Sequence, residues 1–178
     1  GSETLIILHG LFGSLDNWQG IAQIFSKDFT VYAVDQRNHG KSPHFNQHNY
    51  SLMAADLNEF MVQQKIDKAH LLGHSMGGKT VMQAAVDYPA VVDKLIVADM
   101  APKHYAPHHQ TIIKALKSVD FNKVSGRKDI QEILERQIDD PSVVQFLLKG
   151  VMRITKSEMG WKFNLPTISD EIENIGEA

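Results

Sequence analysis

The stretch GHSMGGKT, residues 73–80, matches two motifs with unrelated chemistries. Its first five residues fit G-x-S-x-G, the strand-to-helix turn that presents the nucleophilic serine of many hydrolases. All eight residues also fit G-x-x-x-x-G-K-[ST], the loop that binds nucleotide phosphates in P-loop proteins. The surrounding sequence therefore has to be used to distinguish the hydrolase motif from the phosphate-binding motif.

Short apolar runs and helical patterns alternate on both sides of the stretch. The runs are residues 4–8 (TLIIL), 30–35 (TVYAVD), 69–72 (AHLL) and 94–99 (KLIVAD). Helices are predicted after Ser14, after Ser51 and from Met76 to Tyr88. Continuous apolar runs between helices indicate an α/β fold with a mostly parallel sheet and helices on both faces. Ligands bind such sheets at the carboxyl ends of the strands, where Ser75 and Asp99 fall.

The pattern changes after Pro102. The remaining residues contain no strand–helix alternation and predict helical pieces at about 107–119, 126–138 and 140–152, followed by an extended piece from Trp161 to Leu165. We therefore expect a sheet core in residues 1–102 and a helical cap in residues 103–178.

Composition excludes several classes of function. The chain has 178 residues, a net charge of −3 and no cysteine, so it offers no disulfide and no thiolate metal site. It has no basic block for binding nucleic acid and no apolar run of membrane-spanning length. No signal peptide is visible, and we expect a cytoplasmic protein.

In the phosphate-loop interpretation, Lys79 binds the phosphates, Thr80 coordinates a magnesium ion, and Asp99 helps to hold that ion. The context disagrees, because such a loop usually follows the first strand of its domain. It also leaves the glycine-bearing turns upstream without a role. This nucleotide-hydrolase interpretation of Gly73–Thr80 is kept as an alternative.

The serine-hydrolase interpretation explains those turns. Gly73 and Gly77 are small enough for the tight turn around Ser75, and the Met76 N–H then points at the oxyanion. A second N–H is expected from LHGLFG, residues 8–13: Leu11 is the first candidate and Phe12 the alternative. An aspartate at position 99 is placed to orient a histidine.

Four motifs together resemble one family. HGLFGS (9–14), DQRNHGKS (35–42), GHSMGGK (73–79) and DMAP (99–102) are similar to segments of the YbfF-like esterases of the α/β-hydrolase superfamily. The segments QFLLKG (145–150) and WKFNLP (161–166) resemble that family's cap. The resemblance implies Ser75 as nucleophile, Asp99 as triad acid, and a carboxylic ester or acyl thioester, acyl-CoA included, as substrate. It implies no cofactor.

The chain departs from this family at its ends. The family's catalytic histidine follows two further strands near the C-terminus, whereas this sequence ends at Ala178 and begins after the family's first strand pair. We therefore expect the C-terminal strands and the triad histidine outside this chain, and a complementing C-terminal segment as partner. A non-catalytic or truncated hydrolase is the third hypothesis.

Other residues have simpler expected roles. Asp35, Arg37 and His39 are expected to fix a turn, His74 to pack within the elbow, and Lys79 to lie on a helix surface. Phe12 and Phe146 are candidates for contact with substrate. The cap histidines are expected to form a solvated loop with no metal site, although one of them is an alternative general base; they are His104, His108 and His109.

Overall fold

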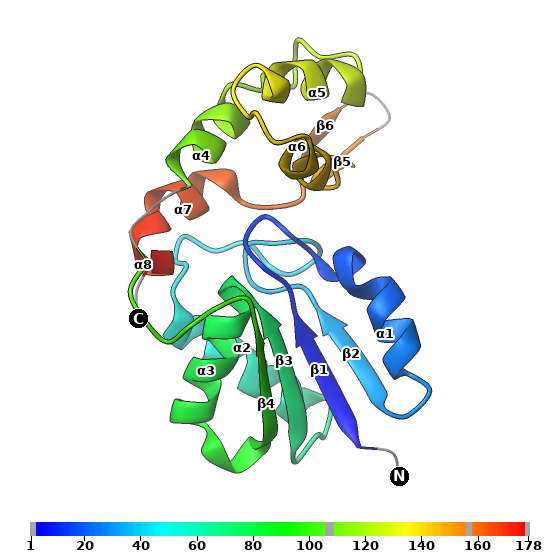
Figure 1. Ribbon diagram of the computed structural model, residues 1–178, viewed down its shortest axis with the longest axis vertical. Helices are drawn as coiled ribbons and strands as arrows, with labels where there is room; N and C mark the ends of the chain where they lie inside the picture. Colours follow the sequence, from blue (N-terminus) through cyan, green and yellow to red (C-terminus); the bar gives the residue numbers. More distant parts are fainter. Residues whose placement is uncertain (1–2, 106–108, 156–157, 177–178) are drawn as a thin grey trace.

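A four-stranded parallel sheet forms the centre of the fold (Figure 1). The computed structural model describes residues 3–105, 109–155 and 158–176. The strands stand in the order β2-β1-β3-β4, and in chain order they are β1 (Thr4–Leu8), β2 (Thr30–Val34), β3 (Ala69–His74) and β4 (Val92–Ala98). All four predicted strands are confirmed. Because Leu8 lies beside both Val34 and Gly73, the carboxyl ends of the strands meet at one edge.

Helices cover both faces of this sheet, as predicted. They are the 3-10 helix η1 (Leu15–Trp18), α1 (Gln19–Phe25), α2 (Tyr50–Gln63), α3 (Met76–Asp87) and the 3-10 turn η2 (Pro89–Val91). Leu5 and Ile7 point to the face covered by α1, and Ile6 and Leu8 point to the face covered by α2 and α3. Successive side chains of a strand alternate between faces, so a strand covered on both faces is apolar throughout.

The start of α2 differs from the prediction. Asn49 caps this helix, because its Oδ1 accepts the Leu52 N–H at 3.0 Å. Ser51 lies inside the first turn and is not the cap. Asparagine and serine cap helices about equally well, so the two candidates, two residues apart, could not be separated by residue type.

The chain after β4 folds over the carboxyl ends of the strands (Figure 1). Its elements are α4 (Gln110–Lys117), α5 (Arg127–Glu135), α6 (Pro141–Leu148), β5 (Val151–Arg153), β6 (Met159–Trp161), α7 (Leu165–Asp170) and α8 (Ile172–Gly176). Its apolar residues share one cluster with Leu11, Phe12 and Met76 of the sheet part. The division at residue 102 stays a prediction.

The predicted helical piece at 140–152 is too long at its C-terminal end, and a two-stranded sheet follows it that was not predicted. β5 and β6 pair antiparallel, with Val151 opposite Trp161, and α6 ends at Leu148 instead of running to residue 152. The chain leaves the helix at Gly150, whose carbonyl accepts the Lys162 N–H at 2.7 Å. A Cβ at this position would lie 2.7 Å from the Phe163 ring, so only glycine lets the two segments approach so closely.

The two outer strands of the sheet have one neighbour each among the described residues. On β4 the apolar residues Leu95 and Ile96 are 42% and 45% exposed. None of the helices in the described ranges is long and apolar enough to cross a membrane.

Candidate active site

Ser75 occupies a strained turn between β3 and α3. Its backbone angles, φ 52° and ψ −117°, are rarely adopted by residues with a side chain and cost about 1–3 kcal/mol. Two hydrogen bonds hold this conformation: the Ser75 N–H donates to the Ala98 carbonyl at 3.1 Å, and the Lys79 N–H donates to the Ser75 carbonyl at 3.2 Å. The turn therefore presents a partly exposed serine at the carboxyl edge of the sheet.

Two glycines make this turn sterically possible. A Cβ on Gly73 would lie 2.1 Å from the Gly77 carbonyl oxygen. A Cβ on Gly77 would lie 2.5 Å from the Leu8 oxygen and 2.7 Å from the His9 oxygen of β1 and its following loop. These atoms belong to the backbone and cannot rotate away, so the sequence demand for small residues at both positions has a steric cause.

The loop after β1 runs beside Ser75. A small chamber of about 40 Å³ is lined by Leu11, Ser75 and Met76 together. No hydrogen bond among the described residues uses the N–H of Leu11 or of Met76. The Phe12 N–H, by contrast, donates to His39 Nε2 at 3.2 Å, so the alternative oxyanion donor is already engaged.

Two buried histidines, His9 and His39, hold that loop in place, and the His48 ring packs beside His39. The His9 Nε2 accepts the Gln36 N–H at 3.0 Å, and His39 Nδ1 lies 3.0 Å from the Arg37 carbonyl. Burial lowers the pKa of His9 and of His39, and it brings the pKa of His48 to about 4, with the nearby Arg37 charge adding to the effect. Neutral His39 can therefore accept from Phe12 at Nε2 while it donates through Nδ1.

The predicted turn at residues 35–42 is confirmed in its hydrogen bonds. Asp35 accepts the N–H of Leu15 at 2.8 Å and that of Lys41 at 2.9 Å. The Arg37 guanidinium binds Asp56 through two nitrogens, at 2.6 and 2.7 Å. The motif therefore ties η1, the turn itself and α2 to one another.

A cleft of about 490 Å³ opens on Ser75 from the side of α1, α4 and α6. Both residues expected to contact substrate line this cleft, and the Phe12 ring also packs against Phe163 at a centroid distance of 5.1 Å. The apolar lining comes from several elements and comprises Leu11, Phe12, Trp18, Ile21, Ile112, Val143, Phe146 and Leu147.

Asp99 directly follows β4, and its side chain is 92% exposed. The His74 ring is close to it, with Nε2 4.0 Å from Asp99 Oδ2. The expectation that His74 packs within the elbow is wrong, because its side chain is 43% exposed and lines the cleft. It points outward because the tight turn leaves room only for glycine on the inner side.

The cap histidines lie at different distances from Ser75. His109 precedes α4 and lines both the chamber and the cleft that contain Ser75. His104 is exposed in the chain before it, and His108 lies outside the described residues. Within those residues no histidine makes a hydrogen bond to the Ser75 hydroxyl.

Lys79 and Thr80 do not face a phosphate site. Lys79 is 3% exposed, which contradicts the expectation of a helix-surface lysine, and its Nζ donates to the Lys103 carbonyl at 2.8 Å. The same ammonium group lies over the rings of Tyr50 and Tyr105. Thr80 is fully buried, and its hydroxyl lies 2.8 Å from Gln36 Oε1. A phosphate loop needs both groups at its ligand, so the geometry does not favour that alternative.

Sequence analysis missed the roles of His39, Lys79 and Tyr50. The Tyr50 hydroxyl donates to the Ile175 carbonyl at 2.8 Å and fixes α8 beside the chamber. Each of these contacts joins residues at least 24 positions apart. The only available signal was a histidine next to glycine in the residue 35–42 motif, which indicates a constrained turn but no partner.

The parallel sheet with a strained serine turn between its third strand and the following helix defines a class of protein, the α/β hydrolases. The sequence model described as "alpha/beta hydrolase fold" matches residues 3–128, and the chain belongs to this family.

Similar proteins include several esterases. The chain is 40% identical to a Haemophilus influenzae protein and 37% identical to the Escherichia coli protein "Esterase YbfF", in each case over 98% of this chain. It spans 60% and 67% of the length of these two relatives. Among solved structures, "Marine microorganism esterase" is 45% identical with a TM-score of 0.96, and the match covers all of this chain and 70% of that one.

Proposed function

We propose that the protein is a serine esterase or thioesterase that works through an acyl-enzyme at Ser75. The observation that carries the proposal is the Ser75 conformation, φ 52° and ψ −117°, at the mouth of an apolar cleft. A strained residue is retained where the strain is part of a function. Here it lifts the hydroxyl out of the turn toward a substrate carbonyl.

The N–H groups of Leu11 and Met76 form the oxyanion hole in this proposal. Both residues line the chamber beside Ser75, and the neighbouring Phe12 N–H is committed to His39. Ser75 attacks the acyl carbon, the oxyanion forms between the two N–H groups, and the alcohol or thiol leaves. Water then hydrolyses the acyl-enzyme. Each donor contributes about 2.7–4 kcal/mol to lowering the barrier.

The acyl group is proposed to lie in the 490 Å³ cleft between Phe12 and Phe146. Its lining is predominantly apolar, which suits an aliphatic acyl chain rather than a polar or charged one. The names of relatives support this chemistry, since one Danio rerio relative, 37% identical, is named "sn-1-specific diacylglycerol lipase ABHD11".

We assign Asp99 as the acid that orients the triad histidine. Its exposed side chain at the carboxyl edge of the sheet is accessible to a histidine from another segment. We place that histidine in a complementing C-terminal segment, because Ser75 has no histidine partner among the described residues and the relatives are longer chains. His109, which lines the cleft, is the alternative base within this chain.

Labelling with an alkyl fluorophosphonate tests this proposal. The chain of 178 residues and a chain extended at its C-terminus along the family pattern are compared, each with its Ser75→Ala variant. We expect rapid labelling of the extended chain only, and its loss in Ser75→Ala. Loss of a triad member leaves about 10³–10⁴-fold catalysis over water, so weak ester hydrolysis by the shorter chain agrees with the proposal.

Three outcomes would contradict parts of the assignment. Labelling of neither chain excludes the serine nucleophile. Full activity of the 178-residue chain by itself excludes an external histidine, and a loss of that activity in His109→Gln then assigns the base to the cap. Magnesium-dependent nucleotide binding that disappears in Lys79→Ala would restore the phosphate-loop alternative.

A further inference from the structure

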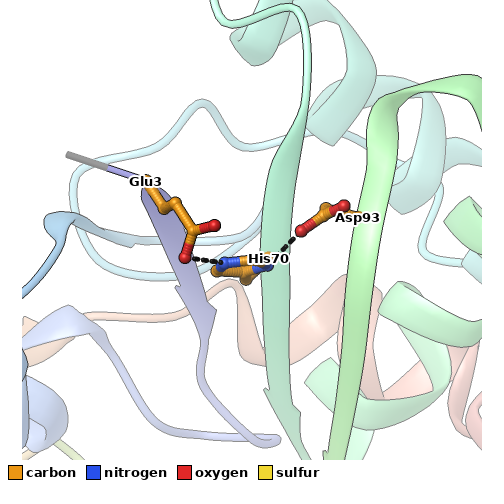
Figure 2. A group of neighbouring side chains, drawn as sticks. All are labelled: Glu3, His70 and Asp93. Atoms are coloured by element: carbon orange, nitrogen blue, oxygen red, sulfur yellow. Dashed lines mark hydrogen bonds and ion pairs between the residues drawn. The ribbon is translucent and has the colours of Figure 1, made fainter. Parts of the chain in front are cut away.

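Three residues from adjacent strands meet at the amino end of the sheet, the end opposite to Ser75. Figure 2 shows the His70 ring between the carboxylates of Glu3 and Asp93. Glu3 directly precedes β1, and His70 and Asp93 are the second residues of β3 and β4. The parallel register, with Leu5 beside His70, brings these strand starts together.

An irregularity in the pairing of β3 and β4 lies at the histidine. Ala69 is paired with Val92 but Leu71 is paired with Leu95, so β4 has one extra residue opposite His70. Such a bulge redirects a side chain and is common beside sites. The residues that follow the Ala69–Val92 pair are His70 and Asp93, so these two side chains lie side by side where the irregularity begins.

The distances of the cluster suit a small cation. Asp93 Oδ2 lies 3.0 Å from His70 Nδ1, and Glu3 Oε2 lies 3.1 Å from Nε2. One ligand atom from each residue lies within 4.8 Å of the other two. Ligands at ~2.1 Å around a tetrahedral zinc ion are about 3.4 Å apart. Glu3 Oε2 is hydrogen-bonded to Nε2 on the other edge of the ring, so its side chain, 65% exposed, has to leave that nitrogen to join Asp93 and Nδ1 around one ion.

The histidine itself points to a ligand. The His70 side chain is only 5% exposed, yet its Nδ1 makes no hydrogen bond, because Asp93 is close to this atom but not in the direction of a hydrogen bond. A buried polar atom without a hydrogen bond is uncommon and calls for a partner. Two carboxylates beside it carry two negative charges, and Lys68 Nζ, 3.4 Å from Asp93, offsets one of them.

We propose that Glu3, His70 and Asp93 bind a zinc ion, with His70 Nδ1, one oxygen of each carboxylate and a water as ligands. Zn²⁺ accepts imidazole nitrogen and carboxylate oxygen as ligands, at distances of about 2.0–2.2 Å. Mg²⁺ and Ca²⁺ prefer oxygen ligands alone. The bound ion joins β1, β3 and β4 at their starts and so stabilises the sheet at the end remote from Ser75.

Thermal unfolding with and without zinc chloride, after treatment with EDTA, tests the proposal. At a zinc concentration about 100 times Kd, we expect Tm to rise by about 5–10 °C for a chain of this length. Magnesium chloride should give no such rise. The variants Glu3→Gln and Asp93→Asn, both at exposed side chains, should each lose most of the zinc response.

Further controls separate this site from other histidines. His44 is exposed and distant in sequence, and His44→Gln should keep the full response. His70→Gln removes the nitrogen ligand and should also lose the zinc response. If this variant does not fold, Glu3→Gln and Asp93→Asn still test whether the cluster binds zinc. Titration calorimetry should show one zinc ion per chain. A zinc response that is absent, or unchanged in Glu3→Gln and Asp93→Asn, refutes the site.

Discussion

Replacing Gly77 by alanine tests the close packing of α3 against the end of β1 beside the proposed site. The new Cβ would lie 2.5 Å from the Leu8 oxygen and 2.7 Å from the His9 oxygen, whereas ordinary contacts begin at 3.4 Å. Helix α3 would therefore have to move by about 0.9 Å from the end of β1, the difference between 3.4 and 2.5 Å. Both clashing atoms are backbone atoms of a buried strand and its loop, so a side-chain rotation cannot relieve them.

The free energy of unfolding should fall by about 2 kcal/mol in this variant. Overpacking of this kind costs about 3 kcal/mol at the upper end of the usual range, and the better helix propensity of alanine returns about 1 kcal/mol. For a chain of this length, this loss of stability lowers Tm by about 4–8 °C. Calorimetry, or circular dichroism of the helices, measures the change in Tm. Fluorophosphonate labelling of Ser75 should also slow in the extended chain.

Two other glycines provide matched controls. Gly20 lies in α1 with nothing within 4 Å of its added Cβ, so Gly20→Ala should be neutral or stabilising by up to about 1 kcal/mol. At Gly78 the nearest atom is a Val97 methyl group at 3.0 Å, which can rotate, so Gly78→Ala should fall between the two. A Gly77→Ala protein as stable as Gly20→Ala would refute the packing of α3 on β1 described above.

Two further predictions concern the buried histidines. Because the pKa of His9, His39 and His48 is lowered in the folded chain, the unfolded chain binds more protons below about pH 6.5, and stability should be constant above about pH 7 and fall toward pH 4. A pKa of about 4 for His48 corresponds to a loss of about 3 kcal/mol in the free energy of unfolding from this residue alone. Urea unfolding between about pH 7.5 and 4.5 measures this loss. An equally steep fall of stability in His48→Gln would contradict the assignment. His39→Leu removes the acceptor of the Phe12 N–H and should slow fluorophosphonate labelling of the extended chain about tenfold or more, with His44→Gln as the unaffected control. An unchanged labelling rate in His39→Leu would show that His39 does not position the oxyanion loop.

The sheet was predictable because each strand leaves a local signal, from burial on both faces in β1 and β3 and from a run of apolar residues in the outer strands β2 and β4. Each strand is apolar at consecutive positions, and each is followed by a glycine or a polar residue at the edge that carries Ser75. The short strands β5 and β6 have three residues each and no such signal. Their pairing depends on Gly150 and Phe163, which are adjacent only after the chain has turned back.

The site was predictable only in part, for a related reason. The spacing in GHSMGGKT defines the turn around Ser75, since the steric demand acts between residues four positions apart. The partner of Lys79 lies 24 positions away, and Glu3 lies 67 positions from His70. Neither contact is encoded in any local pattern, and the cluster of Glu3, His70 and Asp93 follows only from the register of the strands.

The turn at residues 35–48 links the oxyanion loop to the chain that covers it. On one side, His39 accepts the Phe12 N–H. On the other side, the Gly40 N–H donates to the Lys162 carbonyl at 2.6 Å, and the Asn164 N–H donates to the Asn38 carbonyl at 2.8 Å. Movement of the segment at 162–164 must therefore act on the turn, and through His39 on the loop that carries Leu11. These hydrogen bonds connect the segment at 162–164 to the proposed oxyanion hole, so we expect a substitution there to alter catalysis without touching the substrate.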